Sequence, residues 1–167
     1  MSDKRDISAA KWIVMYLFAV VILVLADQLT KYLAVLFLKG QDPVSVLPGI
    51  LLLLYTENTG AAFGILKGKQ WFFYAVALIV VIGVTFFLSR LPRKKRYLPL
   101  YLDFCFIAAG AIGNVIDRMR LGYVVDFIYF KPIDFPVFNV ADIYITCACA
   151  VLVFLFMFYY KEDELRF

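Results

Sequence analysis

Four long apolar runs, separated by polar segments, dominate the pattern along the chain. They extend over residues 12–37, 71–88, 98–116 and 141–160. A helix of about 20 apolar residues crosses a membrane, so each run is long enough to span one. The first run follows three basic residues but is too long for a signal peptide and lacks an Ala-x-Ala-like exit. The pattern therefore predicts an α-helical integral membrane protein of four transmembrane helices, forming one domain over residues 1–167.

Two of the connections also carry a pattern of their own. Residues 43–55 contain β-branched and aliphatic positions around a Pro48-Gly49 turn, and residues 123–130 are β-branched and aromatic. Such composition is typical of strands. We expect a small strand-containing platform at one end of the helices.

The basic residues indicate which way the helices point. Lys4, Arg5 and Lys11 precede the first run, and residues 90–96 between the second and third runs carry five more Lys and Arg. Because cytoplasmic connections are rich in Lys and Arg, we expect both termini to be cytoplasmic. Residues 39–70 and 119–140 then face outward, with the platform on the outer leaflet.

Eight polar side chains lie near the predicted outer ends of the helices or in the outer connections. Polar and ionisable groups near hydrocarbon are costly, so each is a candidate functional residue. They come from segments far apart in sequence and yet are predicted to meet at one leaflet. They are Asp27, Asn58, Asn114, Asp117, Arg118, Asp126, Asn139 and Asp142.

Composition narrows the chemistry. The chain is 64% hydrophobic with a mean hydropathy of +0.85, whereas soluble domains are roughly 45–50% apolar. It contains no His, which excludes His-ligated zinc proteases and Ser-His triads. We expect no metal or cofactor, and we interpret the three cysteines, which lie inside apolar runs, as small buried side chains. The net charge of +4 is concentrated in residues 90–96, which indicates topology rather than nucleic-acid binding.

Most of the eight residues have a structural explanation as well as a functional one. Asp27 and Lys31 are four residues apart and would pair on one helix face. Asn114, Asp117 and Arg118 are spaced for a network at a helix end, and Asn139 would cap the last helix with Asp142 at its third position. Asp126, a carboxylate among apolar neighbours, has no such explanation.

Two close carboxylates suggest acid–base chemistry. Both cannot ionise cheaply, so one retains a proton while the other activates water, as in aspartic proteases. We select Asp126 and Asp142 as this pair. The alternative is a small polytopic transporter or channel subunit whose aspartates bind a cation or relay protons, although the polar residues cluster at one face. A purely structural scaffold would leave the pair unexplained.

Five ordered motifs, covering almost the whole chain, resemble those of the lipoprotein signal peptidase (signal peptidase II) family. They are Asp27-Gln-Leu-Thr-Lys31, Asn58-Thr-Gly-Ala-Ala-Phe63, Gly113-Asn-Val-Ile-Asp-Arg118, Val125-Asp-Phe127 and Phe138-Asn-Val-Ala-Asp142. One departure is Ala109 before Gly110, where the family usually has paired glycines.

The resemblance implies an aspartyl endopeptidase of the bacterial cell membrane, with an outer β-cradle and a short outer helix. We also expect a monomer, and the predicted topology places its active site near the outer leaflet. Its partners would be membrane lipids and a lipid-modified prolipoprotein, cleaved just before the diacylglyceryl cysteine, with no nucleic acid. The resemblance assigns catalysis to Asp126 and Asp142. It assigns substrate binding or orientation of the pair to the remaining six: Asp27, Asn58, Asn114, Asp117, Arg118 and Asn139.

Overall fold

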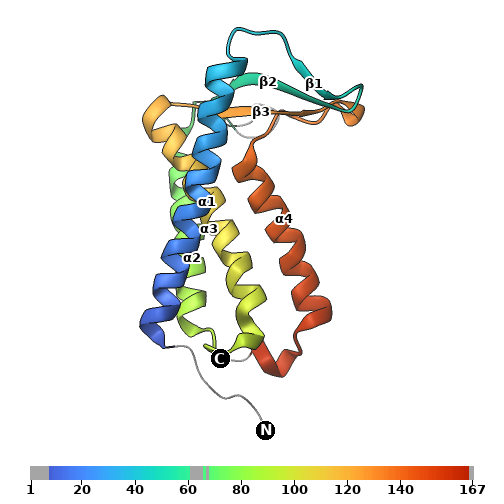
Figure 1. The fold of residues 1–167 in the computed structure, drawn as a ribbon. Coiled ribbons are helices and arrows are strands. Elements are labelled where there is room, and N and C mark those ends of the chain that lie inside the picture. Colours follow the sequence, from blue (N-terminus) through green and yellow to red (C-terminus); the bar gives the residue numbers. More distant parts are fainter. Residues whose placement is uncertain (1–7, 61–65, 67, 166–167) are drawn as a thin grey trace.

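Four long helices lie side by side, and a small sheet extends across one end of them (Figure 1). The structure is a computed structural model that describes residues 8–60, 66 and 68–165. Part of the predicted motif that begins at Asn58, residues 61–63, lies outside the described residues, as do Lys4 and Arg5.

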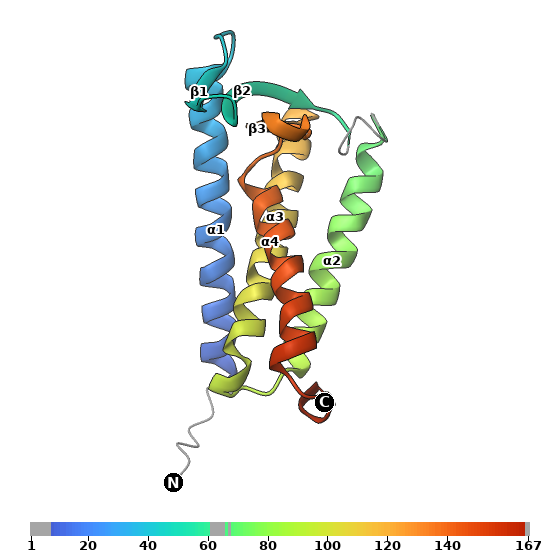
Figure 2. The ribbon, with the colours of Figure 1, turned by 90° about the vertical axis from the view of Figure 1, so that its right-hand side faces the viewer.

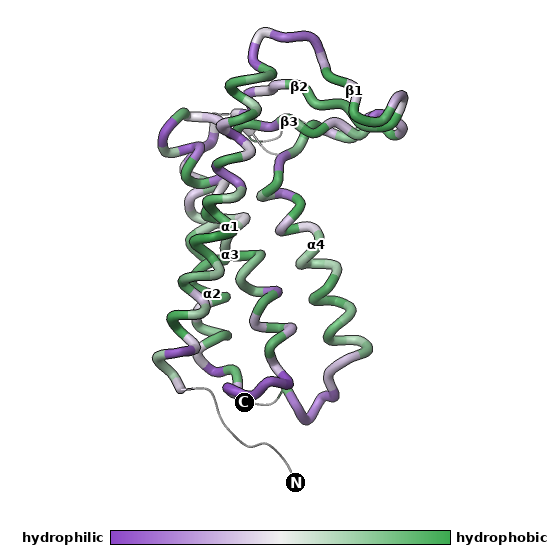
Figure 3. Tube along the Cα trace, in the orientation of Figure 1, coloured by the Kyte–Doolittle hydropathy of each residue, from purple (hydrophilic) through white to green (hydrophobic). Residues whose placement is uncertain are grey.

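The helices are long and apolar enough to cross a membrane. They are α1 (Ala9–Leu38), α2 (Gln70–Arg90), α3 (Leu98–Leu121) and α4 (Val140–Phe154), which continues as a π-helical turn, η4 (Leu155–Tyr159). Large side chains such as Phe18 and Ile79 remain 68% and 69% exposed, as expected where lipid covers them. The hydropathy along the chain shows the same division, with apolar helix shafts and more polar ends (Figure 3).

The third helix is central. It packs against α1, α2 and α4, and half of its apolar window is buried, compared with 11% for α1. Figure 2 shows α1 and α2 on opposite sides of α3 and α4. The main core includes Leu100, Tyr101 and Ala108 on α3, all nearly inaccessible.

Small residues allow α3 to approach its neighbours closely. A Cβ atom added at Gly110 would lie 2.6 Å from the carbonyl oxygen of Ala141 on α4, and one at Gly113 would lie 2.5 Å from Oδ2 of Asp27 on α1. Cβ atoms essentially never lie closer than 3.0 Å to such atoms, so a side chain at either position would force a neighbour to shift. Glycine at both positions therefore allows the close packing seen here.

The predicted platform is a three-stranded antiparallel sheet in the order β1-β2-β3. The strands are β1 (Val44–Leu47), β2 (Leu51–Asn58) and β3 (Val124–Phe130). A second core joins the sheet to the end of α1, where Ala34 and Leu38 pack against Val125 and Phe127. A short 3-10 helix, η3 (Lys131–Ile133), follows β3. Four membrane-spanning helices and this sheet confirm the predicted fold class.

The register of the sheet places two candidate residues at the same end of the strands. Thr56 pairs with Asp126 and Asn58 with Val124. An irregularity in the register between Leu53 and Thr56 precedes them, as is common where a strand redirects a side chain.

The opposite end of the bundle carries the basic connection between α2 and α3. It contains the 3-10 helix η2 (Lys95–Tyr97), and Arg96 forms an ion pair with Glu164 of η5 (Glu162–Leu165). The sheet and the basic connection thus lie at opposite ends of the helices (Figure 1).

Candidate active site

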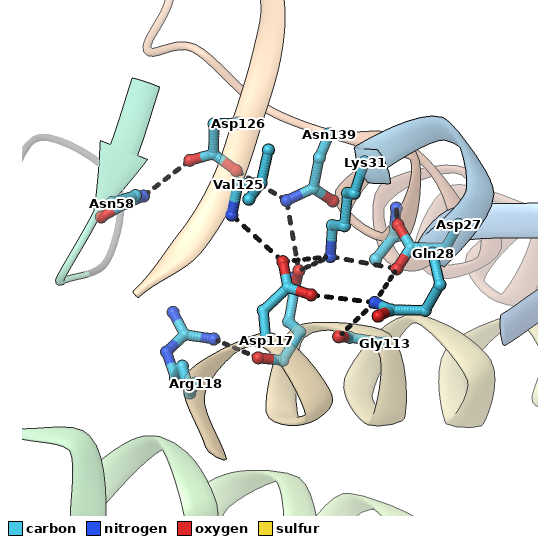
Figure 4. A network of polar contacts seen from close by, with 12 residues as sticks. Asp27, Gln28, Lys31, Asn58, Gly113, Asp117, Arg118, Val125, Asp126 and Asn139 are labelled. Carbon is cyan, nitrogen blue, oxygen red and sulfur yellow. Dashed lines mark hydrogen bonds and ion pairs between the residues drawn. The ribbon is translucent and has the colours of Figure 1, made fainter. Parts of the chain in front are cut away.

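All eight predicted polar residues belong to one connected network beneath the sheet. They come from α1, β2, α3, β3 and the start of α4. Figure 4 shows side chains of α1, β2, α3 and β3 converging with that of Asn139, which precedes α4. The sequence prediction that these distant segments meet at one end is confirmed by the hydrogen bonds described below.

Asp126 is delivered by β3 and is 2% exposed. Its Oδ2 accepts a hydrogen bond from Nδ2 of Asn58 at 2.9 Å, and its Oδ1 accepts one from Nδ2 of Asn139 at 2.6 Å. Burial, together with the negative charge of Asp142, raises the pKa of Asp126 to about 6, despite the two amide donors. This carboxyl group therefore retains its proton to a higher pH than an ordinary aspartate.

Asp142 is positioned by the amino terminus of α4. Asn139 caps α4 as predicted, and with Asp142 it forms a capping box: each side chain accepts a hydrogen bond from the backbone N–H of the other, both at 3.1 Å. Nδ2 of Asn114 donates to Oδ1 of Asp142 at 2.8 Å. The Asp142 carboxylate thus accepts hydrogen bonds from a side-chain amide and from a backbone N–H at the amino terminus of α4.

Asn139 connects the two aspartates. It is completely buried, it contacts Asp142 through the capping box, and its Nδ2 donates both to Asp126 and, at 3.1 Å, to Oδ1 of Asn114. The capping interpretation from the sequence is correct, and the same side chain also bridges the candidate pair.

Asp27 and Asp117 lie beside the pair and do not touch it directly. The predicted ion pair between Asp27 and Lys31 exists, with Oδ2 and Nζ 3.0 Å apart, but it is buried rather than exposed at a helix end. Lys31 also lies 3.2 Å from Oδ2 of Asp117. Lys31, which the sequence predicted to pair only with Asp27 on the same helix, therefore joins α1 to α3.

Arg118 extends toward the loop that follows β2. Its Nη2 donates to the carbonyl oxygen of Gly60 at 3.0 Å, and its guanidinium lies 4.2 Å from the ring centre of Phe73 on α2. Its Nε is buried and has no hydrogen-bond partner among the described residues. Gly60 in turn connects Arg118 to Asn58, because the backbone N–H of Gly60 donates to Oδ1 of Asn58 at 2.9 Å.

Two further residues contribute to the network and were not predicted from the sequence. Gln28 donates to Oδ1 of Asp117 at 2.9 Å and to the carbonyl oxygen of Gly113 at 3.2 Å, and Phe73 stacks on Arg118. Gln28 follows Asp27 directly, so its position in the first motif was a usable signal. Phe73, one of many aromatic residues in an apolar run, offered none.

Both aspartates line a cavity of about 750 Å³ between α2, α3, α4 and the sheet. Its polar wall contains both carboxylates with Asn58, Asn114 and Arg118. Its other walls are apolar and include Phe73, Val76 and Val80 of α2, Ile107 and Ala111 of α3, and Ile143 and Ile145 of α4. A cavity of this kind suits an extended apolar ligand that presents one polar group to the carboxylates.

Cys147 and Cys149 also line this cavity and are exposed. The prediction that all three cysteines are buried is wrong for these two, because they lie on the cavity side of α4 rather than in the core; Cys105 is buried. Among the described residues, no group of three or more His, Cys, Asp or Glu side chains is arranged to hold a metal ion.

Comparison with known proteins identifies relatives over most of the chain. The family model for signal peptidase (SPase) II matches residues 19–158. A lipoprotein signal peptidase of Brevibacillus brevis is 44% identical over 138 residues, which cover 83% of this chain and 91% of the relative. One from Streptococcus pyogenes serotype M6 is 37% identical over 150 residues, covering 90% and 95%.

Solved structures agree with the sequence relatives. A bacterial membrane enzyme determined at 2.3 Å by the in meso method superimposes with a TM-score of 0.78 at 33% identity, covering 89% of this chain and 92% of that one. A second structure described in the same way, at 1.9 Å, gives a TM-score of 0.74 at 33% identity, covering 87% and 94%.

Proposed function

The chain belongs to the signal peptidase II family of aspartic-type endopeptidases, and on this basis we propose that Asp126 and Asp142 form its catalytic pair. The reaction is cleavage of prolipoprotein signal peptides, and we propose that the scissile bond is the one just before the diacylglyceryl-modified cysteine. The assignment of the pair rests on Asn139, which contacts both carboxylates. Asp126 and Asp142 also line the same cavity.

In the proposed mechanism the two aspartates differ in protonation. Asp142, which we propose to be the ionised member, takes a proton from water, and the water oxygen attacks the carbonyl carbon. Asp126, whose pKa is raised to about 6, gives its proton to the carbonyl oxygen. This produces an uncharged tetrahedral diol without any metal.

Collapse of the diol reverses these roles. Asp126 recovers its proton from one hydroxyl group, and Asp142 passes the proton that it holds to the departing nitrogen of the cysteine residue. The carbon–nitrogen bond breaks, and the new carboxyl end of the signal peptide and the new amino terminus of the lipoprotein leave. The pair returns to its starting state with one proton.

The remaining residues would hold the substrate or the pair. Asn58 and Asn139 orient Asp126, and Asn114 orients Asp142, through the hydrogen bonds described above. Arg118 lines the cavity, and its Nε has no hydrogen-bond partner in the described part of the chain, so we propose that its guanidinium reorients to donate to a substrate carbonyl oxygen. The apolar walls suit the hydrophobic stretch of the signal peptide and the acyl chains.

The orientation in the membrane follows from charge. The end of the bundle that carries residues 90–96 would lie in the cytoplasm, together with both termini, and the sheet would lie on the outer leaflet. The enzyme would act as a monomer, since the pair and the cavity are completed within one chain. Cysteine labelling at Gln41 and Lys94 tests the orientation, which requires the two positions to react from opposite sides.

The catalytic assignment is tested with purified Asp126→Asn and Asp142→Asn variants and a diacylglyceryl-modified prolipoprotein. Each substitution keeps the size of the side chain but removes an acid or a base, so cleavage should fall at least a thousandfold while the variants remain folded. Asp42→Asn, at an exposed position between α1 and β1, is the matched control and should retain full activity. Full activity in either variant of the pair would refute the assignment. Comparable cleavage of the unlipidated precursor would refute the proposed lipid requirement.

A further inference from the structure

Lys31 occupies a position that none of the proposed catalytic steps uses. Its ammonium group is buried, with 3% of the side chain exposed. It lies 3.0 Å from Oδ2 of Asp27 and 3.2 Å from Oδ2 of Asp117, and it donates to Oδ1 of Asn114 at 2.9 Å. An ammonium group has three N–H bonds, and here there are three acceptors, one on its own helix and two on α3.

The two carboxylates held by Lys31 each make a second contact to a segment that carries a catalytic aspartate. Oδ1 of Asp27 accepts the backbone N–H of Ala141 at 3.0 Å, and Ala141 immediately precedes Asp142. Oδ2 of Asp117 accepts the backbone N–H of Val125 at 3.1 Å, and Val125 immediately precedes Asp126. One lysine therefore joins the backbone anchors of both aspartates.

The third acceptor leads to the pair through a side chain. Oδ1 of Asn114 accepts from Lys31 and from Asn139, so its Nδ2 must point to Oδ1 of Asp142, 2.8 Å away. An ammonium group can only donate. Its presence therefore excludes the flipped orientation of the Asn114 amide, in which an N–H group would face Lys31 and the carbonyl would face the carboxylate.

We propose, on the basis of the catalytic pair proposed above, that Lys31 is the positioning residue that sets the placement of Asp126 and Asp142, through Asp117, Asp27 and Asn114. Figure 4 shows Lys31 between Asp27, Asp117 and Asn139. Lys31 lies behind Asn114, which lines the cavity, so it acts on the reaction through other residues and not on the substrate. A buried ion cluster is weak evidence for a contribution to stability, whereas fixing a geometry is a use of such clusters that is documented in some systems.

The charge of Lys31 also reaches the reacting groups. The charged side chains that face Asp126 are Asp142 from α4, Arg118 from α3 and Lys31 from α1. The negative charge of Asp142 raises the pKa of Asp126 and the positive charge of Lys31 lowers it. Loss of the ammonium group should therefore move the pKa of Asp126 upward.

The first test compares Lys31→Met with Lys39→Met in steady-state cleavage of a lipidated prolipoprotein. Lys39 is the matched control, since it follows the end of α1 and pairs with an exposed Glu57. For Lys31→Met we expect kcat to fall at least tenfold and KM to change less than twofold. In the pH–rate profile, the fall in activity that accompanies deprotonation of Asp126 should move to higher pH. Lys39→Met should change none of these. Wild-type kcat and an unmoved pH–rate profile in Lys31→Met would overturn the positioning role.

A second variant separates positioning from folding. Lys31→Met alone leaves two buried carboxylates without their counter-charge. The double variant Asp27→Asn/Lys31→Met removes one positive and one negative charge and so keeps the net charge of the cluster. The amide oxygen introduced at position 27 can still accept the backbone N–H of Ala141. We expect this double variant to fold, by size-exclusion chromatography and thermal melting, with kcat reduced and KM retained. A folded double variant with wild-type kcat, or one that does not fold, would contradict the positioning role.

The outcomes distinguish this inference from the proposed function. If Asp126→Asn or Asp142→Asn remains active, the catalytic pair itself is wrong. If both are inactive and the Lys31 variants behave as wild type, the catalytic pair stands and only the role of Lys31 fails.

Discussion

Replacing Gly113 by alanine should damage the enzyme through a single added methyl group. The new Cβ atom would lie 2.5 Å from Oδ2 and 3.1 Å from Cγ of Asp27, so the carboxylate must move. It cannot move freely, because Oδ2 is bound to Lys31 and Oδ1 holds the backbone N–H of Ala141. Displacing it therefore displaces the start of α4, which carries Asp142.

The magnitude follows from two opposing effects. Alanine in place of glycine inside a helix contributes about 1 kcal/mol of stability, whereas overpacking a rigid site costs about 1–3 kcal/mol. The net change in the free energy of unfolding should be a loss of about 1 kcal/mol. The effect on rate should be larger, about ten- to a hundredfold in kcat, because catalysis is sensitive to shifts of under 1 Å in a reacting group.

Gly83→Ala is the matched control. Gly83 lies inside α2, and a Cβ atom added there meets nothing within 4 Å, so only the favourable helix propensity remains. The assays are thermal melting in detergent and cleavage of a lipidated prolipoprotein under saturating substrate. Gly113→Ala should melt below wild type and cleave slowly, while Gly83→Ala should melt at or above wild type and cleave normally. Equal stability and activity in the two variants would refute the packing explanation.

Three further predictions concern the chemistry of the site. First, kcat/KM, which reports the free enzyme, should fall as the pH rises through about 6, because Asp126 has a pKa of about 6 and must be protonated to act as the acid; a kcat/KM that does not fall as the pH rises through about 6 would contradict this assignment. Second, Asn139→Ala should lower kcat by at least a hundredfold and destabilise α4 by about 1 kcal/mol through loss of its cap, and unchanged kcat would exclude Asn139 as the bridge of the pair. Third, EDTA or phenanthroline should leave cleavage intact, since the pair needs no metal, and restoration of a chelator-inhibited enzyme by added Zn²⁺ would overturn the mechanism.

The helices and strands could be predicted because each has a strong local signal. An apolar run of about 20 residues has few alternatives to a membrane-spanning helix, and the β-branched residues before Asp126 favour a strand. The placement of the polar residues followed from topology, since it required only which helix end or outer connection carries each residue. Topology placed all eight residues together, and Asp126 was then selected because a carboxylate among apolar neighbours has no structural explanation.

The contacts themselves could not be predicted in the same way. The spacing of Asp27 and Lys31 indicates a local pair, and nothing in the sequence indicates that Asp117 of another helix shares the same ammonium group. The capping box was predictable from Asn139 and Asp142, but not the second use of the Asn139 amide, which depends on where β3 brings Asp126. Long-range contacts depend on packing between elements, for which a single sequence carries little local signal.

The central claim is that Asp126 and Asp142 together perform the cleavage. The most direct measurement is single-turnover cleavage of a diacylglyceryl-modified prolipoprotein by purified Asp142→Asn enzyme, compared with Asp42→Asn at equal substrate binding. The pair predicts that substrate still binds and that the cleavage rate falls at least a thousandfold. Cleavage at the rate of the Asp42→Asn control would contradict it.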